Sequence, residues 1–285
     1  MHKSISLLVV GLLGCSSLTV NFANAAEVKP LRVLLITGGC CHDYARQKDI
    51  LKQGLEARAN IVVDQVHTDI PAGTAATKPP LPIYGNPDYA KGYDVVIHDE
   101  CAADINDPGI IKGVLAPHRA GLPGVNLHCA MHSYRIGNPG EPATAGSERA
   151  LWFDYLGIQS SRHGAQLPIA IRFTDKTHAL THGLGDWTTI AEELYNNIQI
   201  FPTAKPLAHG RQTLKNKDGP AQEDDYVVAW RNDYHGARVF STTIGHNNAT
   251  VEDARYLDLV TRGLLWACGQ LDGHGNIKPG YGPKK

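Results

Sequence analysis

The sequence predicts one α/β domain built on a doubly wound, mostly parallel sheet with an added β-hairpin. Two observations carry this prediction: continuous apolar runs alternate with amphipathic segments of helical spacing, and the runs end in glycine or in polar residues. Continuous runs of branched apolar residues are typical of parallel strands that are buried on both faces. We therefore expect helices on both sides of the sheet.

A β-α-β unit opens the domain. It consists of an apolar strand at residues 31–37 that ends in a Gly-Gly turn, an amphipathic helix at 45–58 and a second strand at 61–66. Two parallel strands joined in this way form a right-handed crossover.

The middle of the chain continues the alternation after an interruption. Residues 70–92 are too rich in proline and glycine for a helix and are predicted to form a long loop. A third strand at 93–98, a helix at 109–120 and a fourth strand at 124–127 follow.

The second half is less regular. We expect a short amphipathic segment at 151–156, a half-exposed strand at 166–174, a β-hairpin with arms at 226–231 and 237–244, and a closing helix at 251–268. No linker divides residues 26–270, which are predicted to form one domain. Residues 271–285 contain glycine and proline throughout and are predicted to be a flexible tail.

Residues 1–25 have the form of a secretory signal peptide. An apolar segment follows Lys3, and Ala23-Asn24-Ala25 has the small-x-small pattern that signal peptidase cleaves. The apolar segment is shorter than the roughly 20 residues of a spanning helix, so we expect an exported protein, periplasmic or secreted, without a membrane span. Lipid anchoring through Cys15 is the less favoured alternative, because Leu13 fits a lipoprotein cleavage site poorly.

The charge is nearly balanced. The chain has 27 Lys and Arg against 28 Asp and Glu, a net charge of −1, and no basic block. Nothing in this pattern supports electrostatic binding to nucleic acid or anionic membranes. The predicted partner is a small molecule.

Cysteines outside the signal peptide are odd in number, so at least one has no partner within the chain. They are Cys40, Cys41, Cys101, Cys129 and Cys268. Because the strands before them should be neighbours, Cys40 or Cys41 could form a disulfide with Cys101; free thiols are the alternative.

Polar residues follow several predicted strands. In a doubly wound sheet the carboxyl ends of the strands converge on one crevice, where ligands bind. Position alone should therefore bring together His42-Asp43, Asp99-Glu100, residues 128–132 and His246.

Several different short motifs lie at predicted strand ends and turns. They are Thr37-Gly-Gly with His42-Asp43-Tyr44, residues 124–130, residues 175–183, Glu193-Leu194-Tyr195, Ala229-Trp230-Arg231 and residues 236–246. In this order and spacing they resemble the trehalose-utilisation (ThuA-like) family. The resemblance covers nearly all of the chain after residue 25. It implies a flavodoxin-like or class I glutamine amidotransferase-like fold and a role in carbohydrate metabolism, including, for some members, the processing of keto-glycosides.

The first functional hypothesis is a metal-assisted carbohydrate hydrolase or lyase. His42, His128 and His246 would hold one divalent ion, zinc before others, because three neutral imidazoles leave a coordination position open. Asp43, Glu100 or Glu193 would be the general base or would fix a histidine tautomer. The candidate substrate-binding residues are His132, His163, Tyr195 and Trp230. Separate hydrogen-bonding histidines in a polar pocket are the alternative.

Two other hypotheses use the same crevice. Cys129 lies where the amidotransferase-like fold holds its nucleophile, with His246 as the partner histidine, although Asn248 replaces the glutamate that normally orients that histidine. A buried structural cysteine is the commoner case. The other hypothesis is a non-catalytic sugar-binding or accessory protein.

Overall fold

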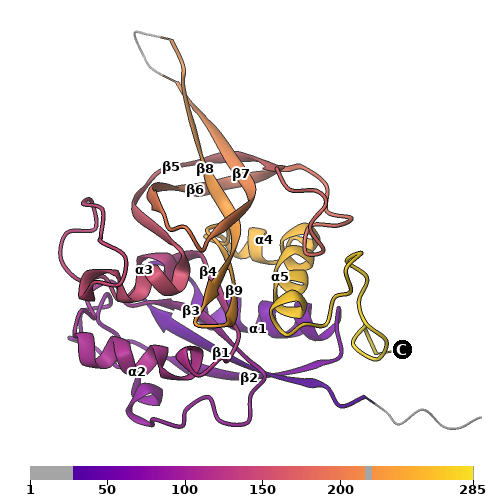
Figure 1. The fold of residues 1–285 in the computed structure, drawn as a ribbon. Helices are drawn as coiled ribbons and strands as arrows, with labels where there is room; N and C mark the ends of the chain where they lie inside the picture. Colours follow the sequence, from indigo (N-terminus) through magenta and orange to yellow (C-terminus); the bar gives the residue numbers. More distant parts are fainter. Residues whose placement is uncertain (1–27, 216–219, 285) are drawn as a thin grey trace, which may run out of the picture.

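The computed structural model describes residues 28–215 and 220–284, and its centre is one mixed sheet of nine strands in the order β2-β1-β3-β4-β9-β8-β7-β5-β6 (Figure 1). The first five strands in this order run parallel. They are β2 (Ile61–Thr68), β1 (Leu31–Gly39), β3 (Val95–Cys101), β4 (Gly124–Leu127) and β9 (Ala237–Thr242). The predicted parallel sheet is therefore present as one half of the observed sheet.

The other half is antiparallel and was only partly predicted. It consists of β8 (Gln222–Tyr234), β7 (Lys205–Leu214), β5 (Ile158–Phe173) and β6 (Trp187–Ile200). The predicted hairpin is present as β8 and β9, but it is not an addition to a parallel sheet, because β9 belongs to the parallel half and β8 begins the antiparallel half. Polar residues interrupt the apolar alternation of β6 and β7, so their period of two gives a weak signal.

Helices cover both faces of the parallel half (Figure 1). Leucines of α1 (Tyr44–Glu56) and α5 (Ala254–Ala267) pack against β1 in one core. Apolar side chains of α2 (Pro108–Arg119) and α3 (Leu151–Leu156) form a second core with β8 and β9 on the opposite face. The smaller elements are η1 (Pro82–Gly85), η2 (His128–His132), η3 (Glu148–Ala150) and α4 (Asn248–Val251).

Aspartates set the starts of three helices. The carboxylates of Asp43, Asp107 and Asp253 accept hydrogen bonds from backbone N–H groups in the first turns of α1, α2 and α5. The cap at Asp253 also corrects one prediction: the single closing helix at 251–268 is two helices, because the extended backbone of Asp253 separates α4 from α5.

The predictions for the two ends of the chain have different outcomes. The signal peptide at residues 1–25 lies outside the described residues. In the segment after residue 270, Gly280 O accepts a hydrogen bond from Asn60 at 2.9 Å, and Arg262 donates to Gly275 O at 2.8 Å. These contacts attach the segment to the domain; its flexibility stays a prediction.

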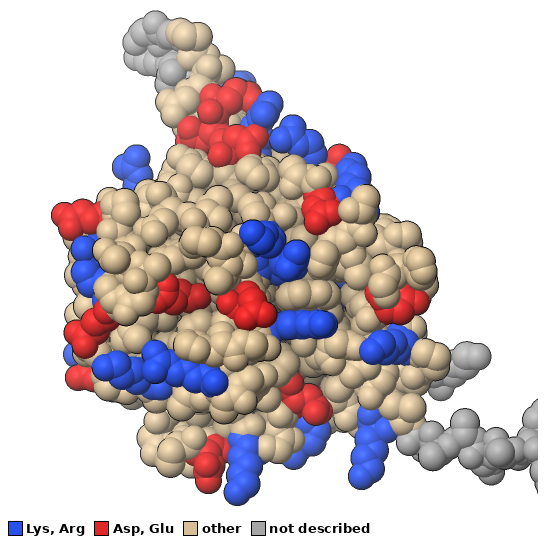
Figure 2. All heavy atoms as spheres, in the orientation of Figure 1, with Lys and Arg blue, Asp and Glu red and all other residues tan. Residues whose placement is uncertain are grey.

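The surface agrees with the balanced charge. Figure 2 shows Lys and Arg interspersed with Asp and Glu on the visible face. Among the described residues, no helix is long and apolar enough to cross a membrane.

A buried histidine pair joins α2 to the sheet. His118 Nδ1 donates to the carbonyl of Leu122 at 2.8 Å, so its Nε2 accepts from His98 Nε2 at 3.0 Å. Burial, and then the neighbouring His98, lower the pKa of His118 from 6.5 to about 3. His118 is therefore neutral in the folded protein at neutral pH.

This pKa predicts a loss of stability in acid. Between pH 6.5 and about 3 the unfolded chain binds a proton at His118 that the folded chain does not bind. The free energy of unfolding should therefore fall as the pH drops through this range. In His118→Gln the fall should be shallower, by up to about 1.4 kcal/mol per pH unit. Urea unfolding at several pH values measures it, with the exposed His274→Gln as control; equal slopes in the wild type and His118→Gln would contradict the assignment.

Candidate functional site

The candidate site lies at the carboxyl ends of the parallel strands, as the strand-end rule predicts. His42 follows the turn after β1, His128 begins η2 directly after β4, and His246 follows β9. β6 of the antiparallel half adds Glu193 and Tyr195 to the same place. The site thus combines residues from both halves of the sheet.

Three imidazole rings converge at this point. The ring centroids of His42 and His128 are 4.5 Å apart, those of His42 and His246 4.9 Å, and those of His128 and His246 5.6 Å. One ring nitrogen from each residue lies within 4.8 Å of the others. Residues from three distant segments thus form one compact nitrogen cluster.

The tautomer of His128 is fixed by the backbone. Its Nδ1 donates to the carbonyl of Thr243 at 2.7 Å, so in the neutral ring the lone pair is on Nε2. Tyr195 Oη lies 3.4 Å from this nitrogen. His42 Nδ1 is buried without a hydrogen-bond partner among the described residues. A histidine that donates its other N–H to a carbonyl is the usual arrangement of a metal ligand.

His246 is held differently. Its Nε2 accepts a hydrogen bond from the Gln166 amide at 2.9 Å, and its Nδ1 lies 3.3 Å from Glu193 Oε1. The neighbouring Glu193 carboxylate raises the pKa of His246. Glu193 therefore supplies the carboxylate that the sequence lacks at Asn248, from a strand far away in the chain.

Burial and the neighbouring charges set the charge states of the cluster. Burial, and then the nearby His128 and His246, lower the pKa of His42 to about 3. Burial alone would raise the pKa of Glu193, but the neighbouring His128 and His246 outweigh it and hold this pKa well below its usual range. The site thus combines a neutral imidazole with an ionised carboxylate, which suits a cation.

A stack of rings forms one wall of the site. The rings of His132 and Tyr195 are parallel to within 5°, with centroids 4.0 Å apart, and His163 stacks at 5.8 Å from Tyr195. His132 is buried and binds Ser160 Oγ through Nε2 at 3.0 Å. Of these three predicted substrate-binding residues, only His163 is exposed. His132 and Tyr195 support the wall from behind.

Two buried residues hold the loop that carries His246. Glu192 accepts hydrogen bonds from the backbone N–H groups of His246 at 3.0 Å and Asn247 at 3.2 Å. Gln47 donates to the carbonyl of His246 at 3.1 Å. Sequence reasoning missed these residues and Gln166. The sequence feature that could have identified Glu192 is the pair of adjacent glutamates, Glu192 and Glu193, in the segment that forms β6.

An open depression of about 470 Å³ exposes His42 and His246 to solvent, whereas His128 is buried beneath it. Its lining residues are Cys41, His42, Asp43, His246, Asn247 and Asn248. Asp43 caps α1 and also accepts from Asn248 at 2.8 Å, so it stands at the rim. A larger concavity lies between Arg119, Phe201 and Tyr234, but among its described lining residues the only histidine is His235. We therefore take the smaller depression, which contains clustered histidines, as the candidate site.

Two predicted site residues lie elsewhere. Glu100 points to the α2 face, where its Oε1 accepts from Tyr84 at 2.7 Å and Tyr134 at 2.8 Å and contacts His98 at 2.9 Å. Successive side chains of a strand point to opposite faces of the sheet. Glu100 therefore points away from the crevice, although it lies near the end of β3. Trp230 is 1% exposed and donates to Leu156 O, which makes it a core residue.

Cys129 is not a free thiol in this structure. Its sulfur is bonded to Cys101, and the side chain is 6% exposed. A cysteine nucleophile requires a thiolate, so this arrangement does not support the amidotransferase-like hypothesis.

Fold and site together define an α/β protein with a histidine cluster at the carboxyl edge of its parallel strands. The family model described as trehalose utilisation, ThuA, matches residues 32–267. The chain therefore belongs to the ThuA family, as its motifs predicted.

Solved structures show the same fold. A ThuA-like protein from Parabacteroides merdae is 21% identical, with a TM-score of 0.59 over 84% of this chain and 90% of its own. One from Bacteroides uniformis is 14% identical, with a TM-score of 0.59 over 86% and 94%. A candidate GMP synthase component from Thermoplasma acidophilum is 10% identical, with a TM-score of 0.50 over 85% and 96%. The comparison with curated proteins gives no match.

Proposed function

We propose that this protein is a metal-assisted enzyme of carbohydrate metabolism, a hydrolase or lyase that acts on glycosides or keto-glycosides. One observation carries the proposal: the His128 lone pair at Nε2, freed by the Nδ1–H bond to Thr243 O, faces a cluster with His42 and His246. Membership of the trehalose-utilisation family supports the carbohydrate part.

The donor set fits a divalent cation. His42, His128 and His246 would hold the ion, zinc before others, and the Glu193 carboxylate would lie beside it. When bound, such an ion polarises a sugar carbonyl or lowers the pKa of a bound water. The buried Nδ1 of His42, which has no hydrogen-bond partner among the described residues, is an independent sign that a ligand belongs there.

Glu193 is the group best placed to move a proton. Its two oxygens lie 3.4 Å from His128 Nε2 and 3.3 Å from His246 Nδ1, and it is ionised. We assign it as the general base. Asp43, at the rim, would bind a substrate hydroxyl through its carboxylate.

The lining of the depression favours a neutral, hydroxyl-rich substrate. Asn247 and Asn248 supply amide donors and acceptors, and Asp43 supplies an acceptor. None of the described residues that line it is Lys or Arg. Exposed His163 could contact a sugar ring at the wall.

A second candidate function is a metal-free sugar-binding pocket. The observation that favours it is the Gln166 amide on His246 Nε2, which occupies the lone pair that a metal would need. Metal binding would require this amide to move away. The two candidates therefore differ in whether a metal is required and in turnover.

A substrate screen tests the proposal. The purified chain is incubated with glycosides and their keto derivatives, with and without zinc, manganese or calcium, and products are followed by chromatography. We expect turnover that depends on an added metal. Binding of a glycoside without turnover under every metal condition would support the second candidate and contradict the first.

Replacing Glu193 with glutamine should separate its chemistry from metal binding. The amide cannot take a proton, so we expect turnover to fall by about 10²-fold or more, with metal affinity changed by about tenfold. Steady-state kinetics and metal titration measure the two effects. Glu223→Gln, on an exposed strand segment, is the matched control. Turnover that stays at the wild-type value would remove the assignment of Glu193 as base.

We further propose that the protein is exported after cleavage of residues 1–25. The proposal depends on the sequence pattern alone. Mass determination of the N-terminus of the protein from the producing cell tests it; an intact Met1 would contradict it.

A further inference from the structure

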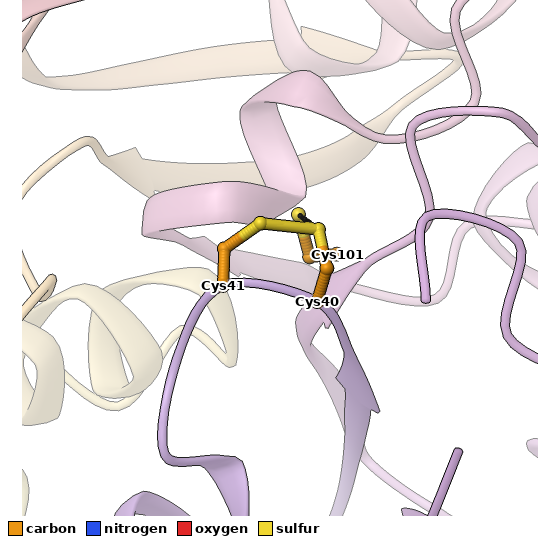
Figure 3. Close-up of side chains that lie close together, drawn as sticks. All are labelled: Cys40, Cys41 and Cys101. Atoms are coloured by element: carbon orange, nitrogen blue, oxygen red, sulfur yellow. Dashed lines mark hydrogen bonds between the residues drawn. A yellow bond between two sulfur atoms is a disulfide. The ribbon is translucent and has the colours of Figure 1, made fainter. Parts of the chain in front are cut away.

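Four cysteines meet beside the histidine cluster. Cys40 and Cys41 follow β1, Cys101 ends β3, and Cys129 lies in η2. Cys40 is bonded to Cys41 and Cys101 to Cys129. Figure 3 shows the first bond and the approach of Cys40 to Cys101, whose Sγ atoms are 3.4 Å apart. Two disulfides from three chain segments are thus in contact.

The backbone adopts unusual conformations to bring these sulfurs together. Gly38 and Gly39 have φ of 140° and 101°, and Cys41 has φ of 82°, a region that non-glycine residues rarely adopt. A Cβ on Gly39 would overlap the carbonyl oxygen of Cys101. Strain of this kind persists where surrounding structure imposes it and often marks a functional site.

The two disulfides differ in access to solvent. Cys41 is exposed and Cys40 is half-buried, whereas Cys101 is 2% and Cys129 6% exposed. A reductant from solvent therefore reaches the Cys40–Cys41 bond, the outer disulfide, before the Cys101–Cys129 bond, the inner disulfide. Cys40 then lies between solvent and the inner disulfide, because its sulfur contacts Cys101.

The sulfurs of Cys40, Cys41 and Cys101 also lie within 4.8 Å of one another, a spacing that a soft metal ion could use if all were thiolates. The bonded pairs favour thiol–disulfide exchange instead, since exchange needs a disulfide and a neighbouring sulfur in contact. Metal coordination is then an outcome that the test must exclude.

We propose that the four cysteines form an exchange relay that carries an electron pair from an external dithiol to Cys129. A thiolate of the dithiol attacks Cys41 Sγ, forms a mixed disulfide and releases the Cys40 thiolate. Cys40 attacks Cys101 Sγ, forms a Cys40–Cys101 bond and releases the Cys129 thiolate, which takes a proton. The second thiol of the dithiol closes a cyclic disulfide and releases Cys41 as a thiol.

The net reaction is balanced. One dithiol is oxidised to its cyclic disulfide, two protein disulfides become one, and the two hydrogens appear on Cys41 and Cys129. Both steps change bonds on residues adjacent in the chain to His42 and His128. The relay is independent of whether the histidine cluster binds a metal.

Peptide mapping of the full chain tests the relay. The protein is treated with limiting dithiothreitol, quenched in acid, alkylated and analysed by mass spectrometry, with an untreated sample beside it. We expect the untreated protein to contain Cys40–Cys41 and Cys101–Cys129. After treatment we expect alkylation at Cys41 and Cys129 and a Cys40–Cys101 linkage.

Three results would overturn the relay. The first is alkylation of Cys40 and Cys41 with Cys101–Cys129 intact, since the electron pair would have stopped at the outer disulfide. The second is any other pairing in the untreated protein. The third is four reactive or metal-bound cysteines before treatment, which would mean that the sulfurs are thiols or ligands.

A double variant supplies a kinetic test. In Cys40→Ser/Cys41→Ser the outer disulfide is absent, so we expect reduction of Cys101–Cys129 to slow by about tenfold or more, because exchange rates depend on access. Cys268→Ser, which removes the one free cysteine among the described residues, is the control. An unchanged rate in the double variant would contradict the relay, and the wild-type mapping decides if the variant does not fold.

Discussion

Replacing His128 with alanine should reduce metal-dependent turnover to background. The substitution removes the ring nitrogen whose lone pair is directed at the cluster, while the Thr243 carbonyl that fixes it remains. Loss of residues that merely orient ligands lowers metal affinity by about 10–100-fold, so loss of a ligand should exceed about 100-fold. Steady-state kinetics with added metal and a competition titration with a chelator measure the two quantities.

The exposed His274→Ala is the matched control, because it removes an imidazole far along the chain from the site residues. It should leave both quantities unchanged. If His128→Ala kept wild-type turnover and metal affinity, His128 would be no ligand and the cluster would be a set of hydrogen-bonding groups. Circular dichroism of each variant confirms that the fold is retained.

Replacing Gly39 with alanine should be among the most destabilising single changes in the chain. Gly39 has φ of 101°, and an added Cβ would overlap the carbonyl oxygen of Cys101 at the end of β3. Both backbones belong to the central sheet and cannot move apart cheaply. We expect a loss of about 3–5 kcal/mol in the free energy of unfolding, from conformational strain and steric overlap together.

Gly73→Ala separates the two causes. Gly73 has φ of 81°, but an added Cβ would meet nothing within 4 Å. It should cost only about 1 kcal/mol, the conformational part alone. Urea unfolding under one fixed redox condition measures both variants. Equal losses would mean that Gly39 is required for its conformation and not for the close approach of β1 to β3.

The parallel half of the fold was predictable because its strands are buried on both faces. Residues 31–37 contain a continuous apolar run that only a central strand explains, and the structure places β1 there. The antiparallel half was not predictable, because in strands such as β6 polar residues, among them Glu, Asn and Gln, interrupt the alternation of apolar and polar side chains. The role of β9 as a parallel strand depended on long-range pairing with β4, which local pattern does not encode.

The site was predictable in part for the same reason. The strand-end rule brought His42, His128 and His246 together, because it needs only the order of parallel strands. It could not place Glu100, whose direction depends on strand parity. Nor could it find Glu192 or Gln166, which come from antiparallel strands that reach the site from the other half of the sheet.

The most direct test of the metal centre is the metal content of the protein. The purified chain is loaded with zinc, manganese or calcium, dialysed, and analysed by inductively coupled plasma mass spectrometry. The same is done for the variant with His42, His128 and His246 all replaced by alanine. We predict one tightly held ion per wild-type chain, zinc before the others, and none in the variant. A wild-type chain that retains no ion, or a variant that retains as much as the wild type, would contradict the account.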